Sequence, residues 1–199
     1  MNKSGNYSGY DLMMVPLEKL ILEKYRSRLV TRARGDVLEI GAGSGVNFAY
    51  YNKQRIRSLT VTDLDPDPVL RRKMKKYGFN NPVAAEIDAL PFSDNSFDTV
   101  VMTLVLCSVP DPQKAVREIQ RVLRPGGEFI FIEHVASCSR KVKGLQHAVT
   151  PAWKRISGNC HLDRDSVKTI QDQGFHLDKY MQSTLCLIAG GVGKMVSLR

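Results

Sequence analysis

The sequence lacks a long hydrophobic run. No apolar stretch reaches the roughly 18 residues of a membrane-spanning helix, and the first ten residues have no apolar core of a secretion signal. Low-complexity segments and repeats of fixed period are also missing, and the composition is ordinary, with 43% hydrophobic and 25% charged residues. We therefore expect one soluble domain over residues 1–199, which buries roughly 70% of the surface that its unfolded chain exposes.

Cysteine is sparse. The 4 cysteines, Cys107, Cys138, Cys160 and Cys186, lie far apart and form no C-x-x-C pair. This spacing predicts neither a disulfide framework nor a zinc knuckle, and it favours a reducing cytoplasm. Cys160 and the adjacent His161 lack a second pair of ligands, so no metal site is expected there. Cys107 is interpreted as a small buried apolar residue rather than a nucleophile.

Acidic residues are fewer than basic ones, with 20 Asp and Glu against 29 Lys and Arg, for a net charge of +9. The excess lies in residues 1–34, 71–76 and 140–168. Solvated helix faces account for this charge, and contact with a membrane surface is the alternative. Because aromatic residues do not interleave with the basic ones, we expect no nucleic-acid partner. Nothing in the sequence indicates an oligomeric state.

Strand and helix patterns alternate along the chain. Strands are predicted at 36–40, 58–63, 82–86, 98–104, 128–133, 175–182 and 187–196, and helices at 44–53, 68–77, 112–123 and 163–173. Parallel strands require crossover connections, so this order predicts an α/β fold with a parallel sheet and helices on both faces. An amphipathic helix over 15–30 precedes the first strand.

A glycine-rich turn follows the first predicted strand, in "VLEIGAGSGVNF". Gly41, Gly43 and Gly45 leave a backbone against which a bulky ligand can lie. Asp65 follows 20 residues after Gly45, after the next predicted strand, where a carboxylate can accept the hydroxyl hydrogens of a ribose. Ligands of such sheets gather at the carboxyl ends of the strands, so this arrangement predicts a nucleotide site.

Two positions argue against a dinucleotide. A dinucleotide turn requires glycine at position 46 and an apolar residue at 39, where this chain has Val46 and Glu39. The Glu39 carboxylate would repel a pyrophosphate but attract a cationic ligand. S-adenosylmethionine, which carries a sulfonium, an ammonium and no phosphate, satisfies these requirements.

Alternatives exist for the neighbouring acidic residues. "VTDLDPD" also resembles the D-x-D of aspartyl-phosphate phosphatases, although that motif is expected at the start of its domain. Asp63, Asp65 and Asp67 could instead cap the helix that begins at Pro68, and we expect Asp67 to do so. The segment 124–127, "RPGG", is interpreted as a turn in which proline ends the preceding helix and glycine supplies positive φ.

Four segments in order over residues 36–134, "VLEIGAGSG", "DLDP", "AEIDALPFSDNSFDTVV" and "EIQRVLRPGGEFIFIEH", resemble the class I S-adenosylmethionine-dependent methyltransferases. "TLVLCSV", "EHVA", "PAW" and "GNCHLDR" are similar, more narrowly, to the thiol S-methyltransferases and to bacterial relatives labelled phospholipid or quinone (UbiE-like) methyltransferases, as far as Arg164. The resemblance implies a single Rossmann-like domain with a doubly wound, seven-stranded, mostly parallel sheet.

The resemblance also implies cofactor-binding roles. The turn with Ala42 would pass beneath the methionine part of the cofactor, Glu39 would orient its ammonium, and Asp65 would hold the ribose. Further predicted contacts are Glu86 and Ile87 at the adenine, with Asp88 as a near alternative, Leu64 and Pro66 at the adenine edge, and the backbone of Thr103 and Leu104 at the methionine end.

Methyl transfer from a sulfonium mainly requires alignment and a dry pocket, and a thiol acceptor is already nucleophilic near neutral pH. We therefore expect methylation of a small apolar acceptor, with a thiol favoured and S-adenosylhomocysteine as the coproduct. The alternatives are a phospholipid or quinone acceptor and a cofactor-binding module without catalysis. Residues 1–34 are predicted to close over the site or pack on the domain, and 135–162 to form an insertion on the acceptor side.

Two side chains on the predicted acceptor side, His134 and Trp153, each allow more than one interpretation. His134 follows the fifth predicted strand and could accept a proton from the acceptor, orient it, or be a hydrogen-bonded structural residue. Trp153 could line the acceptor pocket or pack in the core.

Overall fold

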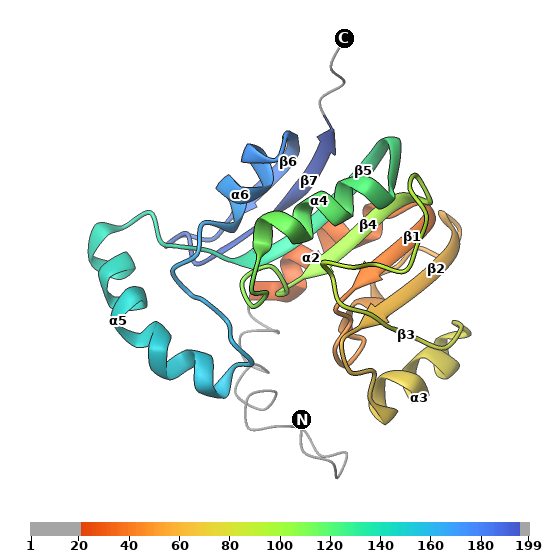
Figure 1. Ribbon diagram of the computed structural model, residues 1–199, viewed down its shortest axis with the longest axis horizontal. Coiled ribbons are helices and arrows are strands. Elements are labelled where there is room, and N and C mark those ends of the chain that lie inside the picture. The colour runs from red at the N-terminus through yellow and green to blue at the C-terminus, as the bar shows by residue number, and fades with distance from the viewer. Residues whose placement is uncertain (1–20, 196–199) are drawn as a thin grey trace.

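The computed structural model describes residues 21–195, which form a sheet covered by helices (Figure 1). The sheet has 7 strands in the order β3-β2-β1-β4-β5-β7-β6. They are β1 (Gly35–Ile40), β2 (Ile56–Asp63), β3 (Val83–Ala84), β4 (Phe97–Thr103), β5 (Leu123–His134), β6 (Phe175–Gln182) and β7 (Ile188–Met195). β7 runs antiparallel to both of its neighbours, β5 and β6, and the other paired strands of the described sheet are parallel. The predicted mostly parallel sheet is confirmed.

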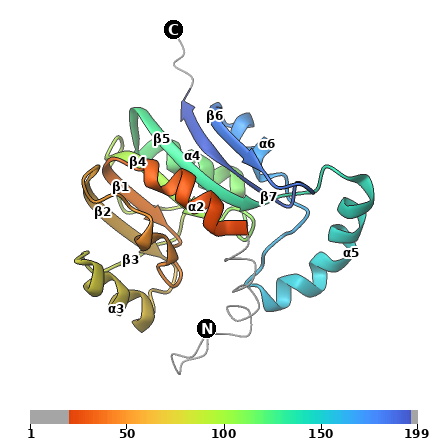
Figure 2. The same ribbon diagram turned by 180° about the vertical axis from the view of Figure 1, so that it is seen from behind.

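Helices cover both faces of the sheet, as predicted. They are α2 (Glu23–Leu29), α3 (Pro68–Tyr77), α4 (Pro112–Val122), α5 (Arg140–Ile156) and α6 (Ser166–Asp172), with short 3-10 turns η2 (Val30–Arg32) and η3 (Val46–Ala49). Figure 1 shows α4 and α6 on the near face, and Figure 2 shows α2 on the opposite face. The strand order changes direction between β1 and β4, which is where ligands of doubly wound sheets bind.

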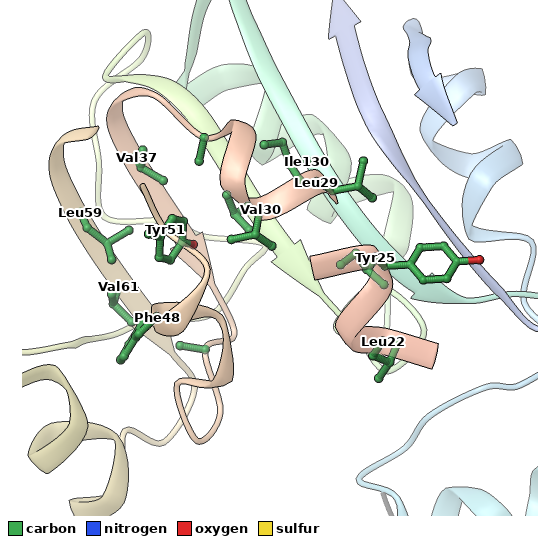
Figure 3. Close-up of a cluster of buried hydrophobic side chains, with 14 of the residues drawn as sticks. Leu22, Tyr25, Leu29, Val30, Val37, Phe48, Tyr51, Leu59, Val61 and Ile130 are labelled. Carbon is green, nitrogen blue, oxygen red and sulfur yellow. The ribbon is translucent and has the colours of Figure 1, made fainter. Parts of the chain in front are cut away.

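Alternating strand residues divide the core between these two faces. In β1, Val37 belongs to the cluster on the α2 side, whereas Leu38 belongs to the cluster on the α4 side. Figure 3 shows the first cluster, in which Leu29 and Val30 pack towards the sheet. Burying each such side chain contributes roughly 1.5–3 kcal/mol. Because residue 39 follows the same alternation as residue 37, the Glu39 side chain points into this apolar layer.

Predicted element boundaries differ most beside the glycine turn. The expected helix over 44–53 is wrong, because only the 3-10 turn η3 forms there after Gly45, whose φ is +67°. By contrast, α3 has its predicted bounds, and the Asp67 carboxylate accepts the Leu70 N–H at 2.7 Å. Asp67 is therefore confirmed as the helix cap.

The "RPGG" segment lies within β5 rather than between elements. Leu123 pairs with Phe97 and Glu128 with Thr99, so residues 124–127 bulge out of the ladder between these two pairs. The predicted positive φ is found at Gly126, at +78°. Residues 124–127 thus form the expected turn, and β5 pairs with β4 both before and after it.

Residues 135–162 contain a helix, α5, that the sequence did not predict. It stands to one side of the sheet in both views (Figures 1 and 2). A buried side chain ties its first half to the domain: Gln146 donates to the carbonyls of Val135 at 3.1 Å and Leu162 at 2.8 Å and accepts the Ser137 N–H at 2.7 Å. Pro151 lies inside the helix and conceals the helical pattern.

The expectation of no disulfide is wrong. Cys138, before α5, is bonded to Cys186, before β7, with their Cα atoms 5.5 Å apart. The sequence separation of 48 residues hid this pair, because β7 returns to lie beside β5 and brings the two loops together. The cysteine-based argument for a reducing compartment therefore fails.

Much of the predicted N-terminal helix, including Pro16, Leu17 and Leu20, falls outside the described residues. The described part, α2, packs on the sheet through Tyr25 and Leu29. No helix within residues 21–195 combines the length and the apolar character needed to cross a membrane.

Candidate cofactor and acceptor site

A cavity of about 330 Å³ lies at the carboxyl ends of the strands. Most of the surface that lines the cavity is apolar, which suits a largely buried organic ligand. The lining residues are Ile40, Gly41, Asp63, Leu64, Ala85, Glu86, Ile87, Asp88, Val105, Ser108, Val109, Pro110, Asp111 and Gly158. The predicted site residues Gly41, Leu64, Glu86, Ile87 and Asp88 are therefore brought together.

The glycine turn borders this cavity through Gly41, whereas Ala42, Gly43 and Gly45 are not among the lining residues. The N–H groups of Gly41 and Ala42 both donate to the Thr62 carbonyl, at 2.9 and 3.1 Å, which fixes the turn against β2. A Cβ on Gly41 would lie 2.4 Å from Val105 Cγ2, so only glycine allows this close approach. A Cβ on Gly43 would meet no atom within 4 Å, and its φ is +53°. Gly43 thus presents open backbone on which a ligand can lie.

The last residue of β2, rather than the predicted Asp65, presents a carboxylate to the cavity. Asp63 lines the cavity and accepts the Gly43 N–H at 2.7 Å and the Asp65 N–H at 3.2 Å. Asp65 and Pro66 are not among the lining residues. Asp63 ends the strand predicted at 58–63, and this position was the sequence signal that it could face a ligand.

The far wall of the cavity follows β3. Ala85, Glu86, Ile87 and Asp88 provide apolar surface, carboxylates and backbone groups there, and Asp88 forms an ion pair with Lys114 at 3.1 Å. Leu64 faces them with 69% of its surface exposed. A flat, apolar group with polar edges suits these residues, and the adenine contacts assigned to them stay a prediction.

Glu39 lies behind the glycine turn instead of in the cavity lining. Its carboxylate is buried and accepts hydrogen bonds from Asn47 Nδ2 and the Tyr51 hydroxyl, both at 2.9 Å. Burial raises the pKa of Glu39 to about 7, against the opposing effect of these two hydrogen bonds. The side chain is therefore poised to gain or lose a proton near neutral pH, and its role towards an ammonium stays a prediction.

The loop after β4 forms the remaining wall. Thr103 accepts a hydrogen bond from Asn47 Nδ2 at 3.1 Å, and Leu104 adopts a φ of +57°, which is rare for a side chain of its size. Neither lines the cavity, but their neighbour Val105 does. Strained backbone of this kind often marks a ligand site.

Glu133, which the sequence analysis did not single out, holds this loop in place. Its Oε1 accepts the N–H groups of Val105 and Leu106 at 2.9 Å, and its Oε2 accepts that of Cys107 at 3.1 Å. Burial raises its pKa to about 7 although these backbone hydrogen bonds favour the charged form. The sequence signal for Glu133 is a charged residue within an apolar strand pattern, as it is for Glu39.

His134 is buried at the end of β5 and is not among the cavity-lining residues. Its Nδ1 lies 3.4 Å from Cys160 Sγ and 4.0 Å from Cys107 Sγ. The Cys160 hydrogen bond with Cys107, and then those with His134 and Trp153, lower the pKa of the Cys160 thiol, whereas the hydrogen bond with Cys160 and burial raise the pKa of Cys107. Trp153 thus contacts Cys160 rather than the cavity.

The chain is similar to known proteins in both its fold and its sequence. A family model described as "Methyltransferase domain" matches residues 38–131, which include the glycine turn, Asp63 and β4. Two solved structures share the fold: YcgJ of Bacillus subtilis (17% identity, TM-score 0.70, 88% of this chain and 100% of that one) and a SAM-dependent methyltransferase of Aquifex aeolicus (16%, 0.59, 89% and 89%). The chain belongs to the class I S-adenosylmethionine-dependent methyltransferases.

Curated relatives are similar over a longer stretch. The human thiol S-methyltransferase TMT1A is 38% identical over 148 residues, covering 70% of this chain and 59% of its own length. A phosphatidylethanolamine N-methyltransferase of Cereibacter sphaeroides is 36% identical, covering 61% and 60%, and the ubiquinone/menaquinone methyltransferase UbiE of Rickettsia felis is 33% identical, covering 62% and 53%. The chain thus spans little more than half the length of these relatives.

S-adenosylmethionine is the cofactor of this class, and the residues present fit it. Gly43, which is not a lining residue but donates its N–H to the lining residue Asp63, offers unobstructed backbone. Asp63 offers a carboxylate, and the wall after β3 offers an apolar slot. Within residues 21–195, no cationic side chain lines the cavity, which suits a ligand without phosphate.

Proposed function

We propose that the protein transfers the methyl group of S-adenosylmethionine to a small apolar acceptor, most favourably a thiol. The apolar cavity that joins the glycine turn, Asp63 and the loop after β4 carries this proposal. The cofactor supplies an activated methyl group on a sulfonium, so the chain needs only to align the two partners and exclude water.

Each wall has a task in this proposal. Asp63 accepts hydrogen bonds from the ribose hydroxyls, Gly43 supports the methionine part, and Ile87 and Leu64 enclose the adenine. Glu133 keeps the loop after β4 in the conformation that places Val105 and Ser108 at the cavity. A thiol acceptor gives up its proton as the carbon–sulfur bond forms. Because a thiol is partly ionised near neutral pH, this step demands little from a protein base.

The similarity to thiol S-methyltransferases supports sulfur as the acceptor atom. The test is an acceptor panel. Purified protein is incubated with methyl-labelled cofactor and alkyl thiols, quinols or phospholipid vesicles, and the products are separated by class. We expect label in the thiols. Turnover of another class with unlabelled thiols would remove the sulfur proposal, and tight cofactor binding without any product would favour a binding module.

A lipid-borne acceptor, phospholipid or quinone, is the second candidate, and α5 favours it. Leu145, Val149 and Ile156 lie on one face of this helix and are 63%, 41% and 61% exposed. Basic residues such as Arg140 and Arg155 accompany them on the same helix. A helix of this kind can rest on an anionic membrane surface, where a lipid-soluble acceptor would be reached.

A further inference from the structure

Three buried side chains from distant parts of the chain meet beside the cavity. Cys107 comes from the loop after β4, His134 ends β5, and Cys160 follows α5; all are buried. The two sulfurs are 3.4 Å apart, and His134 Nδ1 lies 3.4 Å from one sulfur and 4.0 Å from the other. The three donor atoms all lie within 4.8 Å of one another.

We propose that Cys107, His134 and Cys160 form a binding site for a zinc ion. Zinc bound by thiolate sulfur at about 2.3 Å and imidazole nitrogen at about 2.05 Å in a tetrahedron separates two sulfurs by about 3.8 Å and sulfur from nitrogen by about 3.5 Å. The three observed separations, of 3.4, 3.4 and 4.0 Å, differ from these values by half an ångström or less. Small side-chain rotations therefore suffice to admit the ion.

The chemistry of the donors favours zinc over harder cations. Two thiolates and an imidazole are the ligand types that select zinc, whereas magnesium and calcium require oxygen ligands. Two thiolates and a neutral imidazole also balance the charge of a divalent ion, which matters in a site without solvent. The nearby Glu133 oxygens are engaged by three backbone N–H groups.

The backbone around the three residues is held independently of their side chains. The His161 N–H donates to the Cys107 carbonyl at 2.8 Å, and Asn159 Nδ2 donates to the Ser108 carbonyl at 2.9 Å. Arg164 donates to the carbonyls of Leu106 and Val109 at 2.7 and 2.8 Å. The two cysteine-bearing loops are thus joined before any metal binds, which reduces the entropy cost of assembling the site.

Three protein ligands are typical of zinc sites that keep a fourth position for water or a small ligand. Ser108 and Gly158, which stand next to Cys107 and near Cys160 in the chain, line the cavity. The ion would therefore lie behind the cavity wall formed by these loops. The proposal concerns metal binding alone and does not depend on which acceptor is methylated.

Cobalt(II) is the probe, because its thiolate charge-transfer and tetrahedral d–d absorption bands report both the number of sulfurs and the geometry. The full-length chain is reduced, freed of metal and titrated, first with cobalt and then with zinc, while zinc content is measured by elemental analysis. We expect one equivalent of cobalt with the spectrum of two thiolates, displaced by one equivalent of zinc.

The Cys138→Ala/Cys186→Ala double variant is the matched control, since it removes the other two cysteines and leaves the cluster intact. It should bind cobalt as the parent chain does, whereas Cys107→Ala, Cys160→Ala and His134→Asn should each weaken binding by at least about 100-fold. Circular dichroism identifies a variant that fails to fold. The parent spectrum still decides the proposal in that case.

Three results would overturn the site: a reduced parent chain that binds no cobalt, a control that loses the thiolate bands, or a Cys107→Ala chain that keeps them. Recovery of a Cys107–Cys160 disulfide from protein prepared with zinc present would also overturn it, since both sulfurs would then be engaged in that bond.

Discussion

The two halves of the site are built in different ways. The cofactor half, formed by β1, β2 and the turn between them, is fixed by backbone: strand pairing, glycine conformations and hydrogen bonds to the Thr62 carbonyl. The half that we assign to the acceptor, with α5 and the loops around it, is fixed by individual side chains, such as Gln146, Arg164 and the Cys138–Cys186 disulfide. Cofactor binding should therefore tolerate changes that loosen the acceptor half.

Removal of the disulfide should have the largest effect. A cross-link between segments 48 residues apart restricts the unfolded chain, so the Cys138→Ala/Cys186→Ala variant should lose about 2–4 kcal/mol of unfolding free energy. Denaturant titration by circular dichroism measures this loss. Calorimetry should find the affinity for S-adenosylhomocysteine unchanged. An equal loss of cofactor affinity would mean that the two halves are coupled.

Substitution of Asp63, one of the two neighbouring carboxylates Asp63 and Asp65, should have the next largest effect, on cofactor affinity. Asp63→Asn should weaken S-adenosylhomocysteine binding by roughly 1.5–3 kcal/mol, because the ribose would lose charge-assisted hydrogen bonds. The matched variant Asp65→Asn should leave the affinity within about 0.5 kcal/mol of the parent value. Isothermal titration calorimetry on both variants measures the difference. The reverse ranking would restore Asp65 to the role that the sequence analysis assigned to it.

Glu39 provides a smaller, pH-dependent test of the same half. Its pKa of about 7 in the folded protein means that the carboxyl becomes protonated on the acidic side of neutrality. If the cofactor's ammonium lies nearby, binding favours the charged carboxylate, lowers its pKa and releases a proton. The affinity for S-adenosylhomocysteine should then fall as the pH drops below 7, by at most about tenfold per pH unit.

Glu39→Gln is the control for that test, since it cannot ionise but has the same shape. Its cofactor affinity should vary less with pH than that of the parent chain over the same range. Identical pH dependence in the two proteins would show that Glu39 does not sense the ammonium.

Substitutions on α5 should change stability least. Leu145, Val149 and Ile156 are exposed, so replacing all three with Gln should alter the unfolding free energy by only about 0.5 kcal/mol. Flotation with anionic lipid vesicles should show weaker association of this triple variant than of the parent chain. Equal association of both proteins would exclude the exposed face of α5 as a membrane contact.

The same contrast explains how far the sequence could predict the molecule. Strand alternation, the glycine turn and the Asp67 cap are local signals, and they yielded the sheet, α3 and five of the 14 cavity-lining residues. The helix expected over 44–53 is wrong: Gly45 has a positive φ and lies outside the helical region, and only the 3-10 turn η3 follows it. Asp63 lines the cavity whereas the sequence analysis selected Asp65, because sequence spacing does not show which of two neighbouring carboxylates a strand end turns towards a cavity. The role of Asp65 towards the ribose stays a prediction.

The acceptor half depends on contacts between distant segments, which a single sequence does not display. The disulfide joins loops that meet only after β7 has inserted beside β5, and the Cys107–His134–Cys160 cluster requires two loops to converge on the end of β5. Pro151 further obscured α5. Buried acids such as Glu133 can be predicted from the sequence, because they are charged residues within apolar strands.

The crystal structure of the complex with S-adenosylhomocysteine tests the central claim most directly. The Asp63 carboxylate is expected within hydrogen-bond distance of both ribose hydroxyls, with the amino-acid tail lying along Gly43 and the adenine between Leu64 and Ile87. A ribose held by another residue, or a ligand seated away from the glycine turn, would contradict the account.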